Sequence, residues 1–226
     1  MQLLLYLQLA TELSKMVNTE FLKQFGIIPF DTATLTGSLD EYKSPKDKIN
    51  SLEQSNLLIR LKRGLFVVSP KLSYQSLSKE LIANHLYGPS YVSLQKALSY
   101  YKLIPERVHT VNSMTIKRSR NFSTPLGNFD YTGVTKEYYS IGIRQEIVNN
   151  EYAFLIATPE KALCDTIIQT SGLRLQSAKA MRLYLEEDMR IDLSAIEHYN
   201  VEIIEECIAV SKKKKELTLL YKLLQE

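Results

Sequence analysis

The amino-acid sequence predicts an α+β fold with a small helix-and-hairpin region followed by a larger domain. Three observations support this prediction. A capped helical segment precedes two short β-favouring runs around Gly64, period-two patterns recur between residues 108 and 156, and amphipathic helical patterns extend from residue 177 to residue 226. We therefore expect two domains, residues 1–70 and residues 71–226, the second with a small, mostly antiparallel sheet and a helical C-terminal part.

Composition limits the classes of function. The chain has 226 residues, which suffices for one large domain or two small ones, and its 45% hydrophobic content is that of a folded protein with a core. Its formal net charge is only +3, and residues 1–70 hold 8 basic against 7 acidic side chains. Any nucleic-acid-binding surface must therefore be a local patch, defined by where its cations lie.

The first residues, MQLLLYLQLATELSK, lack the features of a targeting or membrane segment. They have no basic start, and polar Gln2, Gln8 and Glu12 interrupt an apolar run that a membrane span would need to continue for about 18 residues. We expect a helix that packs on the core or on a partner. Without a long apolar run we expect no membrane association and a cytoplasmic location. Cys164 and Cys207 lack metal-ligand spacing, which fits reduced thiols in a reducing cytosol.

The N-terminal region is expected to contain helices joined by turns. Gly26 ends the first helical pattern, and Asp31 is a suitable N-cap for a second, short helix. Ser44 as N-cap and Pro45 at the first helical position begin a third. The expected helices cover residues 2–25 with a break near residues 17–19, residues 32–36, and residues 45–56.

The helix after Ser44 has one apolar and one polar face. Ile49 and Leu52 share the side that would be buried. Asn and Gln each suit a bidentate contact with adenine in the major groove, and Lys suits phosphate. The candidate DNA contacts are Lys43, just before the helix, and Lys46, Asn50, Ser51 and Gln54 on its polar side. A solvated helix face is the alternative, and Asp47, which repels phosphate, favours it.

A β-hairpin is predicted directly after this helix. Leu57–Leu61 and Leu65–Val68 are β-favouring runs, and the loop KRG (62–64) has the length and the glycine that a hairpin requires. Helix and hairpin together have the layout of a winged helix. The candidate phosphate contacts at the tip of the wing are Lys62 and Arg63. The alternative is an ordinary surface hairpin that its cations keep soluble.

The second domain is expected to combine helices with a sheet. Helical patterns cover residues 76–86 and 91–101, and a further helix begins at Thr158-Pro159, which provide a cap and a first-turn proline. Short β-favouring runs lie between residues 108 and 156. Residues 177–226 are expected to be helical throughout.

Residues 117–122, KRSRNF, combine cations with an aromatic residue. On a strand, Arg118 and Arg120 would point to one face, spaced for phosphates or for an acidic partner, with Lys117 beside them. An edge strand protected by charge from aggregation is an equal alternative.

The sequence lacks motifs typical of catalysis or metal binding. His85, His109 and His198 have no metal-ligand spacing, and the chain has neither a Gly-rich phosphate loop nor a GxSxG motif. The acidic run Glu186–Asp188 lies among basic residues, which is typical of an ion-paired surface. We therefore expect no enzymatic activity, no catalytic residue, no cofactor and no metal.

An ordered set of motifs resembles a known family. The segments are RLKRGLFVV (60–68), GPSYVSLQKALSYYKLIPE (88–106), KRSRNFSTPLGNFDY (117–131), YYSIGI (138–143) and TPEKALCDTI (158–167). This set, within residues 45–168, resembles the AbiEi-type antitoxins of bacterial type IV toxin–antitoxin systems. The resemblance implies a winged helix-turn-helix that binds inverted repeats in its own promoter, and a second domain that counteracts a cognate nucleotidyltransferase-like toxin.

The leading hypothesis is therefore a DNA-binding transcriptional repressor that acts as an antitoxin. By position, the resemblance implies recognition-helix residues Lys46, Asn50, Ser51 and Gln54 and wing residues Arg60, Lys62 and Arg63. A second hypothesis is a protein-interaction module with a vestigial winged helix. A third is an enzyme that uses the acids of residues 186–188.

Overall fold

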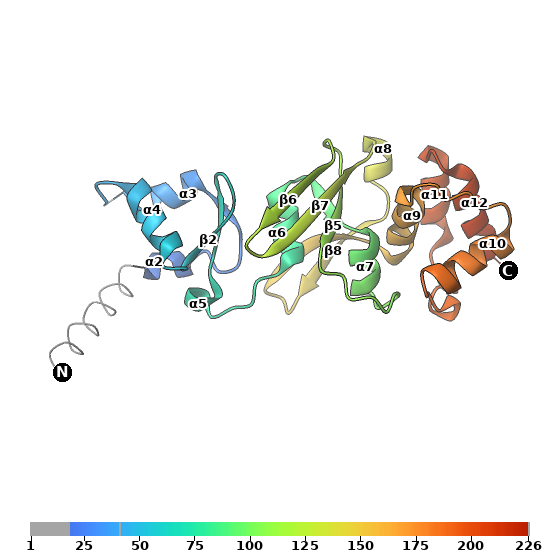
Figure 1. Cartoon of the computed structure of the whole chain (residues 1–226), viewed down its shortest axis with the longest axis horizontal. Helices are drawn as coiled ribbons and strands as arrows, with labels where there is room; N and C mark the ends of the chain where they lie inside the picture. Colours follow the sequence, from blue (N-terminus) through green and yellow to red (C-terminus); the bar gives the residue numbers. More distant parts are fainter. Residues whose placement is uncertain (1–18, 41, 226) are drawn as a thin grey trace. The chain divides into compact units, whose positions relative to one another are not determined.

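Figure 1 shows the fold of the chain, a computed structural model that describes residues 19–40 and 42–225. The helix predicted over residues 2–25 lies mostly outside the described residues. Helices and sheets are both present, which confirms the α+β fold class. The described chain divides into two compact units: residues up to Ser78 with Thr124–Leu126, and the remainder from Lys79.

The first unit is a set of short helices on a three-stranded antiparallel sheet of order β1-β3-β2. Its elements are α2 (Glu20–Lys23), β1 (Phe30–Asp31), α3 (Thr32–Gly37), α4 (Pro45–Gln54), β2 (Leu58–Lys62), β3 (Leu65–Val68) and α5 (Pro70–Ser73). The strand β1 was not predicted. Phe30 pairs with Phe66 and Asp31 with Leu65, so only the folded hairpin supplies the partner that makes these two residues a strand.

Local signals account for most helix starts in this unit. The Asp31 carboxylate accepts a hydrogen bond from the Thr34 backbone N–H at 2.8 Å, which confirms the predicted N-cap of α3. This hydrogen bond lowers the pKa of Asp31. Pro45 occupies the first turn of α4 as predicted, although the Ser44 side chain makes no capping hydrogen bond. These helices therefore begin where the sequence placed them.

One apolar core holds the first unit together. Leu35 from α3, Ile49 and Leu52 from α4 and Phe66 from β3 are all buried in it. Leu72 of α5 belongs to the same core. The structural unit therefore extends beyond residue 70, where the sequence suggested a boundary, and ends at Ser78.

The second unit contains a six-stranded mixed sheet of order β6-β7-β5-β4-β9-β8. The strands are β4 (Ser90–Val92), β5 (Val111–Thr115), β6 (Arg120–Thr124), β7 (Gly127–Gly133), β8 (Ile143–Val148) and β9 (Tyr152–Ala157). Pairs β4–β5 and β8–β9 are antiparallel, whereas β4–β9 and β5–β7 are parallel. The sequence indicated a mostly antiparallel sheet and did not identify the two parallel pairs. Parallel neighbours are separated along the chain by other elements, so local patterns do not reveal them.

The helix predicted over residues 91–101 was wrong at its start. Tyr91 and Val92 form β4, where Tyr91 pairs with Met114 and Val92 with Ile156, and the helix α7 begins only at Leu94. Both strand residues are completely buried. Partners distant in sequence therefore override the helical pattern here.

Helices cover the sheet and form the C-terminal part (Figure 1). They are α6 (Lys79–Leu86), α7 (Leu94–Tyr100), α8 (Lys136–Tyr139), α9 (Pro159–Gln169), α10 (Ala178–Leu183), a π-helical turn η1 (Tyr184–Asp188), a 3-10 turn η2 (Leu193–Ala195), α11 (Val201–Val210) and α12 (Lys214–Leu223). Residues 177–226 are thus not helical throughout. Asp192 and Asn200 cap η2 and α11 through their side chains and so mark breaks.

A buried polar network connects α9 to the rest of the second unit. The Asp165 carboxylate accepts hydrogen bonds from Tyr138 at 2.6 Å, Ser93 at 2.6 Å and Tyr91 at 3.1 Å. Lys161 Nζ lies 3.3 Å from Asp165 Oδ1 and donates to the Tyr138 carbonyl at 2.9 Å. Asp165 and Lys161 have no exposed side-chain surface. The network therefore joins α9 to β4 and α8.

Candidate nucleic-acid interface

The helix α4 presents its predicted polar side to solvent. Lys46, Asn50, Ser51 and Gln54 are exposed, as is Lys43 before the helix, while Ile49 and Leu52 are buried. The apolar pair fixes the rotation of the helix on the core, because residues three apart share one side. Five groups that can contact phosphates or base edges thus lie in or beside one helix.

The hairpin β2–β3 supplies a second set of cations. Lys62 pairs with Leu65, which leaves Arg63 and Gly64 as the tip, and Gly64 adopts a φ of +81° that other residues rarely adopt. The Gly64 carbonyl accepts a hydrogen bond from the Thr32 N–H at 3.1 Å. Arg63 is exposed and Lys62 is half-buried. The tip is therefore anchored to the start of α3.

Arg60, a predicted wing contact, is engaged within the unit. Its guanidinium donates from Nε to Glu53 Oε1 at 2.8 Å and from Nη2 to Glu53 Oε2 at 2.5 Å. It also lies over the Phe66 ring, 4.7 Å from the ring centre. The hydrogen bonds to Glu53 raise the pKa of Arg60. This pair joins α4 to β2, so Arg60 holds the helix and hairpin together.

Two neighbouring residues were not singled out from the sequence. Lys48 Nζ lies 4.9 Å from the centre of the Tyr42 ring, so this lysine covers an aromatic residue that packs against the core. Glu53 is half-buried through its pair with Arg60. The sequence signal for Glu53 was its position seven residues before Arg60, across the end of α4. This spacing becomes informative only once the hairpin is known to fold back.

The cluster of Lys117, Arg118 and Arg120 lies in the second unit. Only Arg120 is in a strand, so the prediction that Arg118 and Arg120 share a strand face was wrong. Residues 116–119 form the connection from β5 to β6, and the Tyr87 hydroxyl donates a hydrogen bond to the Arg118 carbonyl in it at 3.2 Å. Because β5 ends at Thr115 and β6 begins at Arg120, Arg118 is not part of a strand.

Cations and aromatic rings alternate in this cluster. Arg120 lies 5.9 Å from the Tyr87 ring centre and 4.9 Å from that of Phe122, and Lys117 lies 5.2 Å from Tyr87. Lys117 Nζ also donates to the Gly88 carbonyl. Lys117, Arg118 and Arg120 are all exposed. The surface suits phosphates or an acidic partner.

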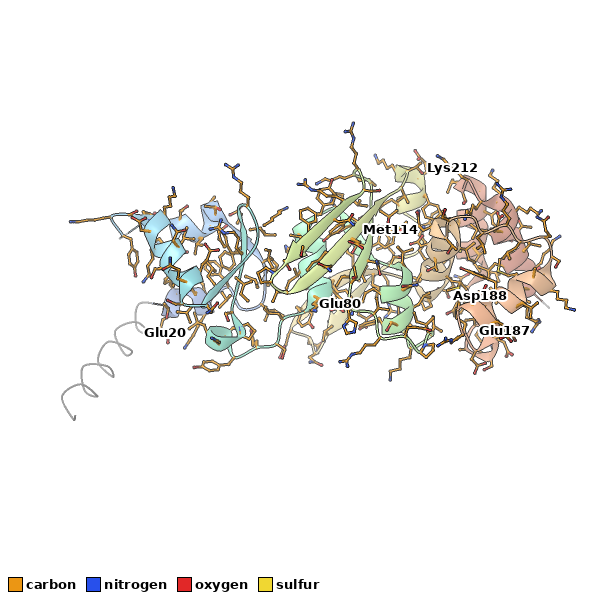
Figure 2. All side chains as sticks on the ribbon, viewed as in Figure 1. Glu20, Glu80, Met114, Glu187, Asp188 and Lys212 are labelled. Carbon is orange, nitrogen blue, oxygen red and sulfur yellow. The ribbon has the colours of Figure 1, made fainter. Side chains whose placement is uncertain are left out.

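The acids of residues 186–188, which the enzyme hypothesis would use, lie on the surface. Figure 2 shows Glu187 and Asp188 on the C-terminal helices, where they and Glu186 are exposed. Within residues 19–40 and 42–225, no group of three or more His, Cys, Asp or Glu side chains could hold a metal ion. Lys161 and Asp165 are close together, but both are shielded completely from solvent.

A cavity of about 530 Å³ lies in the second unit between α8, α9 and the link from α11 to α12. Its lining combines apolar residues such as Ile168 and Val210 with Thr135 and Lys212. The nearby Lys213 ammonium is already hydrogen-bonded to the carbonyls of Ile167 and Thr170. None of the residues that line this cavity is an Asp, Glu, His or Cys.

Comparisons leave the family open. None of the helices that the structure describes is both long enough and apolar enough to cross a membrane. No protein-family model and no curated protein matches the sequence. The resemblance to AbiEi-type antitoxins therefore stays a prediction.

Proposed function

We propose that this protein is a DNA-binding transcriptional repressor in which the first unit is a winged helix-turn-helix. The observation that carries the proposal is the exposure of Asn50, Ser51 and Gln54 on α4, next in sequence to a hairpin with Arg63 at its tip. The elements follow the order β1, α3, α4, β2, β3, and β3 lies between β1 and β2 in the sheet. This order supports the proposal, because we expect the same order in a winged helix. In such folds the second helix of the pair enters the major groove.

The two sets of side chains have different roles in this proposal. Lys43 and Lys46 at the start of α4, with Lys62 and Arg63 on the wing, contact phosphates and position the unit on the duplex. Asn50, Ser51 and Gln54 contact base edges and provide sequence preference. Arg60 acts indirectly, because its pair with Glu53 sets the angle between helix and wing.

The antitoxin role rests on the resemblance described above. The first unit would bind inverted repeats in the promoter of its own operon, and the second unit would counteract a nucleotidyltransferase-like toxin encoded beside it. The exposed Lys117, Arg118 and Arg120 are the candidate contacts of the second unit with phosphate or with that partner.

A protein-interaction module with a vestigial winged helix is the second candidate. The engagement of Arg60 by Glu53 favours it, because one of the three wing cations is then neutralised within the protein. This candidate predicts recovery of a partner from DNase-treated lysate together with no binding to promoter DNA.

The test is fluorescence anisotropy with a duplex from the region upstream of the gene and with a shuffled duplex, at several NaCl concentrations. We expect the affinity for both duplexes to fall as the salt concentration rises. The double variant K62A/R63A should reduce the slope of log affinity against log salt by about two phosphate contacts. Asn50→Ala or Gln54→Ala should instead reduce preference for the upstream duplex, by about 1–3 kcal/mol each.

The matched control is Lys23→Ala with Lys71→Ala, which removes the same charge elsewhere in the first unit and should leave the salt dependence close to that of the wild type. Salt-independent binding, or equal effects of the two double variants, would contradict DNA binding by the wing. Co-expression with the neighbouring gene then tests the antitoxin role through rescue of growth.

A further inference from the structure

The strand β8 is the last strand of the six-stranded sheet, and among the residues that the structure describes it pairs only with β9. The backbone of Leu155, which lies opposite Gln145, is bonded on its other side to Asn84, with Leu155 N–H donating to Asn84 Oδ1 at 2.6 Å. Asn84 Nδ2 donates to the Leu155 carbonyl at 3.3 Å. Leu155 therefore does not exchange hydrogen bonds with Gln145.

The direction of the other backbone groups of β8 follows from this pair. Hydrogen-bonded and non-hydrogen-bonded pairs alternate along an antiparallel ladder. Since Gln145 belongs to a non-hydrogen-bonded pair, the N–H and C=O groups of Ile143, Gln145 and Ile147 point to the open edge of the sheet. This edge is a template for another strand.

One face of β8, with Ile143, Gln145 and Ile147, carries no charge. Ile147 is 62% exposed, although edge strands are commonly protected by charge or proline. Arg144 and Glu146 share the opposite face, where they form an ion pair with each other, and Arg144 lies over the Tyr101 ring at 5.7 Å. The segment Ile143–Ile147, IRQEI, thus has apolar ends and opposite charges placed symmetrically about Gln145.

We infer that two copies of this chain associate through antiparallel pairing of their β8 strands, with Gln145 opposite Gln145 of the second copy. This register places Ile143 opposite Ile147 of the second copy and Arg144 opposite Glu146 of the second copy. Each outward backbone group meets a complementary group, and the two sheets become one sheet across a two-fold axis.

The charges select this register over its neighbours. A shift by two residues in one direction places Arg144 opposite Arg144 of the second copy, and a shift in the other direction places Glu146 opposite Glu146. Like charges directly opposite one another destabilise a strand pair. A shift by one residue would place the outward backbone groups of one copy opposite residues of the second copy whose backbone groups are already bonded to β9. Among these registers, the one centred on Gln145 satisfies both the backbone hydrogen bonds and the charges.

The first experiment measures the dimer dissociation constant of the full chain by sedimentation equilibrium, without DNA. Arg144→Glu and Glu146→Arg each place like charges opposite one another, so each should weaken the dimer at least about tenfold. The double variant R144E/E146R restores opposite charges and should recover dimerisation. A wild-type chain that stays monomeric at all concentrations, or a double variant as weak as the single ones, overturns the proposal.

A second pair of variants tests the apolar contact. Ile147→Lys introduces a charge at the paired edge and should abolish the dimer. Leu183→Lys introduces the same charge at another exposed apolar residue, on α10, and should leave the dimer intact. Thermal unfolding monitors whether each variant is folded. Equal dissociation constants for the two variants would contradict the edge as the interface.

The third experiment locates the axis by cross-linking. In the proposed register the two copies of residue 145 form a hydrogen-bonded pair with Cα atoms about 5.5 Å apart, within the range that a disulfide spans. Gln145→Cys should give a disulfide-linked dimer under mild oxidation, because the native Cys164 and Cys207 are buried. Asn128→Cys, an exposed control on β7, should remain monomeric. Equal cross-linking of both variants overturns the register.

None of these measurements involves DNA, so their outcome is independent of the proposed function.

Discussion

In the first unit, Glu53 and Arg60 form an ion pair at the surface, with side chains 23% and 41% exposed. In the second unit, Lys161 and Asp165 form an ion pair with no exposed side-chain surface, and three hydroxyl groups complete the bonding of Asp165. The first pair joins the elements of a candidate DNA-binding surface. The second lies in the interior, where α8, α9 and β4 meet.

The difference shows that solvent access decides how much an ion pair contributes to stability. Water screens the surface pair, so its loss changes stability little and frees a cation for ligands. In the interior, each charge depends on its partner because water cannot replace it. We therefore expect substitutions of the buried pair in the second unit to change stability most. Substitutions of the surface pair in the first unit should mainly change ligand binding.

The strongest test of this comparison is Asp165→Ala. Its loss leaves the Lys161 ammonium buried without a counter-charge and removes the acceptor of three hydroxyl groups, so unfolding free energy should fall by about 3–5 kcal/mol. Urea unfolding of the full chain, followed by circular dichroism, measures the change. The double variant K161M/D165L should cost less than D165A, since it leaves no unpaired charge. A loss below about 1 kcal/mol for D165A would contradict the network's role.

The next test removes one donor and keeps the ring. Tyr138→Phe deletes the hydroxyl that donates to Asp165 Oδ1 at 2.6 Å. A hydrogen bond to a charged group contributes about 1.5–3 kcal/mol, so the same urea experiment should record a loss in this range. The control is Tyr221→Phe. The Tyr221 side chain is half-buried on α12, and its substitution should have a smaller effect.

A third test uses pH. Burial, and then the Asp165 charge, raise the pKa of Tyr91 and of Tyr138 well above the usual value near 10. Above pH 10 the unfolded chain releases these protons and the folded chain retains them. The stability present at lower pH is therefore lost as pH rises, by about 1.4 kcal/mol per pH unit for each group. Urea unfolding between pH 9 and about pH 11 measures the slope, and Y138F should make it shallower.

The smallest expected effect belongs to Glu53→Ala. Because the pair with Arg60 is partly exposed, stability should fall by only about 0.2–1 kcal/mol. The freed guanidinium should strengthen binding to shuffled DNA and add about one phosphate contact to the salt dependence. Weaker binding instead would indicate that the pair acts mainly by holding α4 against the wing.

Parts of the candidate interface could be predicted because they depend on local chemistry. Asp31 caps α3, Pro45 begins α4, and Gly64 forms the hairpin tip, each through contacts within a few residues. The alternation of Ile49 and Leu52 with polar residues set which side of α4 is exposed. The engagement of Arg60 by Glu53 was not predicted, since it depends on how the hairpin folds back.

By itself, the sequence determined the α+β class, the starts of α3, α4 and α9, and the hairpin, because caps, prolines, glycines and side-chain periodicity act over short spans of chain. The tertiary structure decided the rest. The strands β1 and β4 exist through partners distant in sequence, and Asp165 finds Tyr91 and Ser93 more than seventy residues away, at separations of 74 and 72. Burial makes such contacts obligatory, since a charge or backbone group without water must find its partner wherever the fold places it.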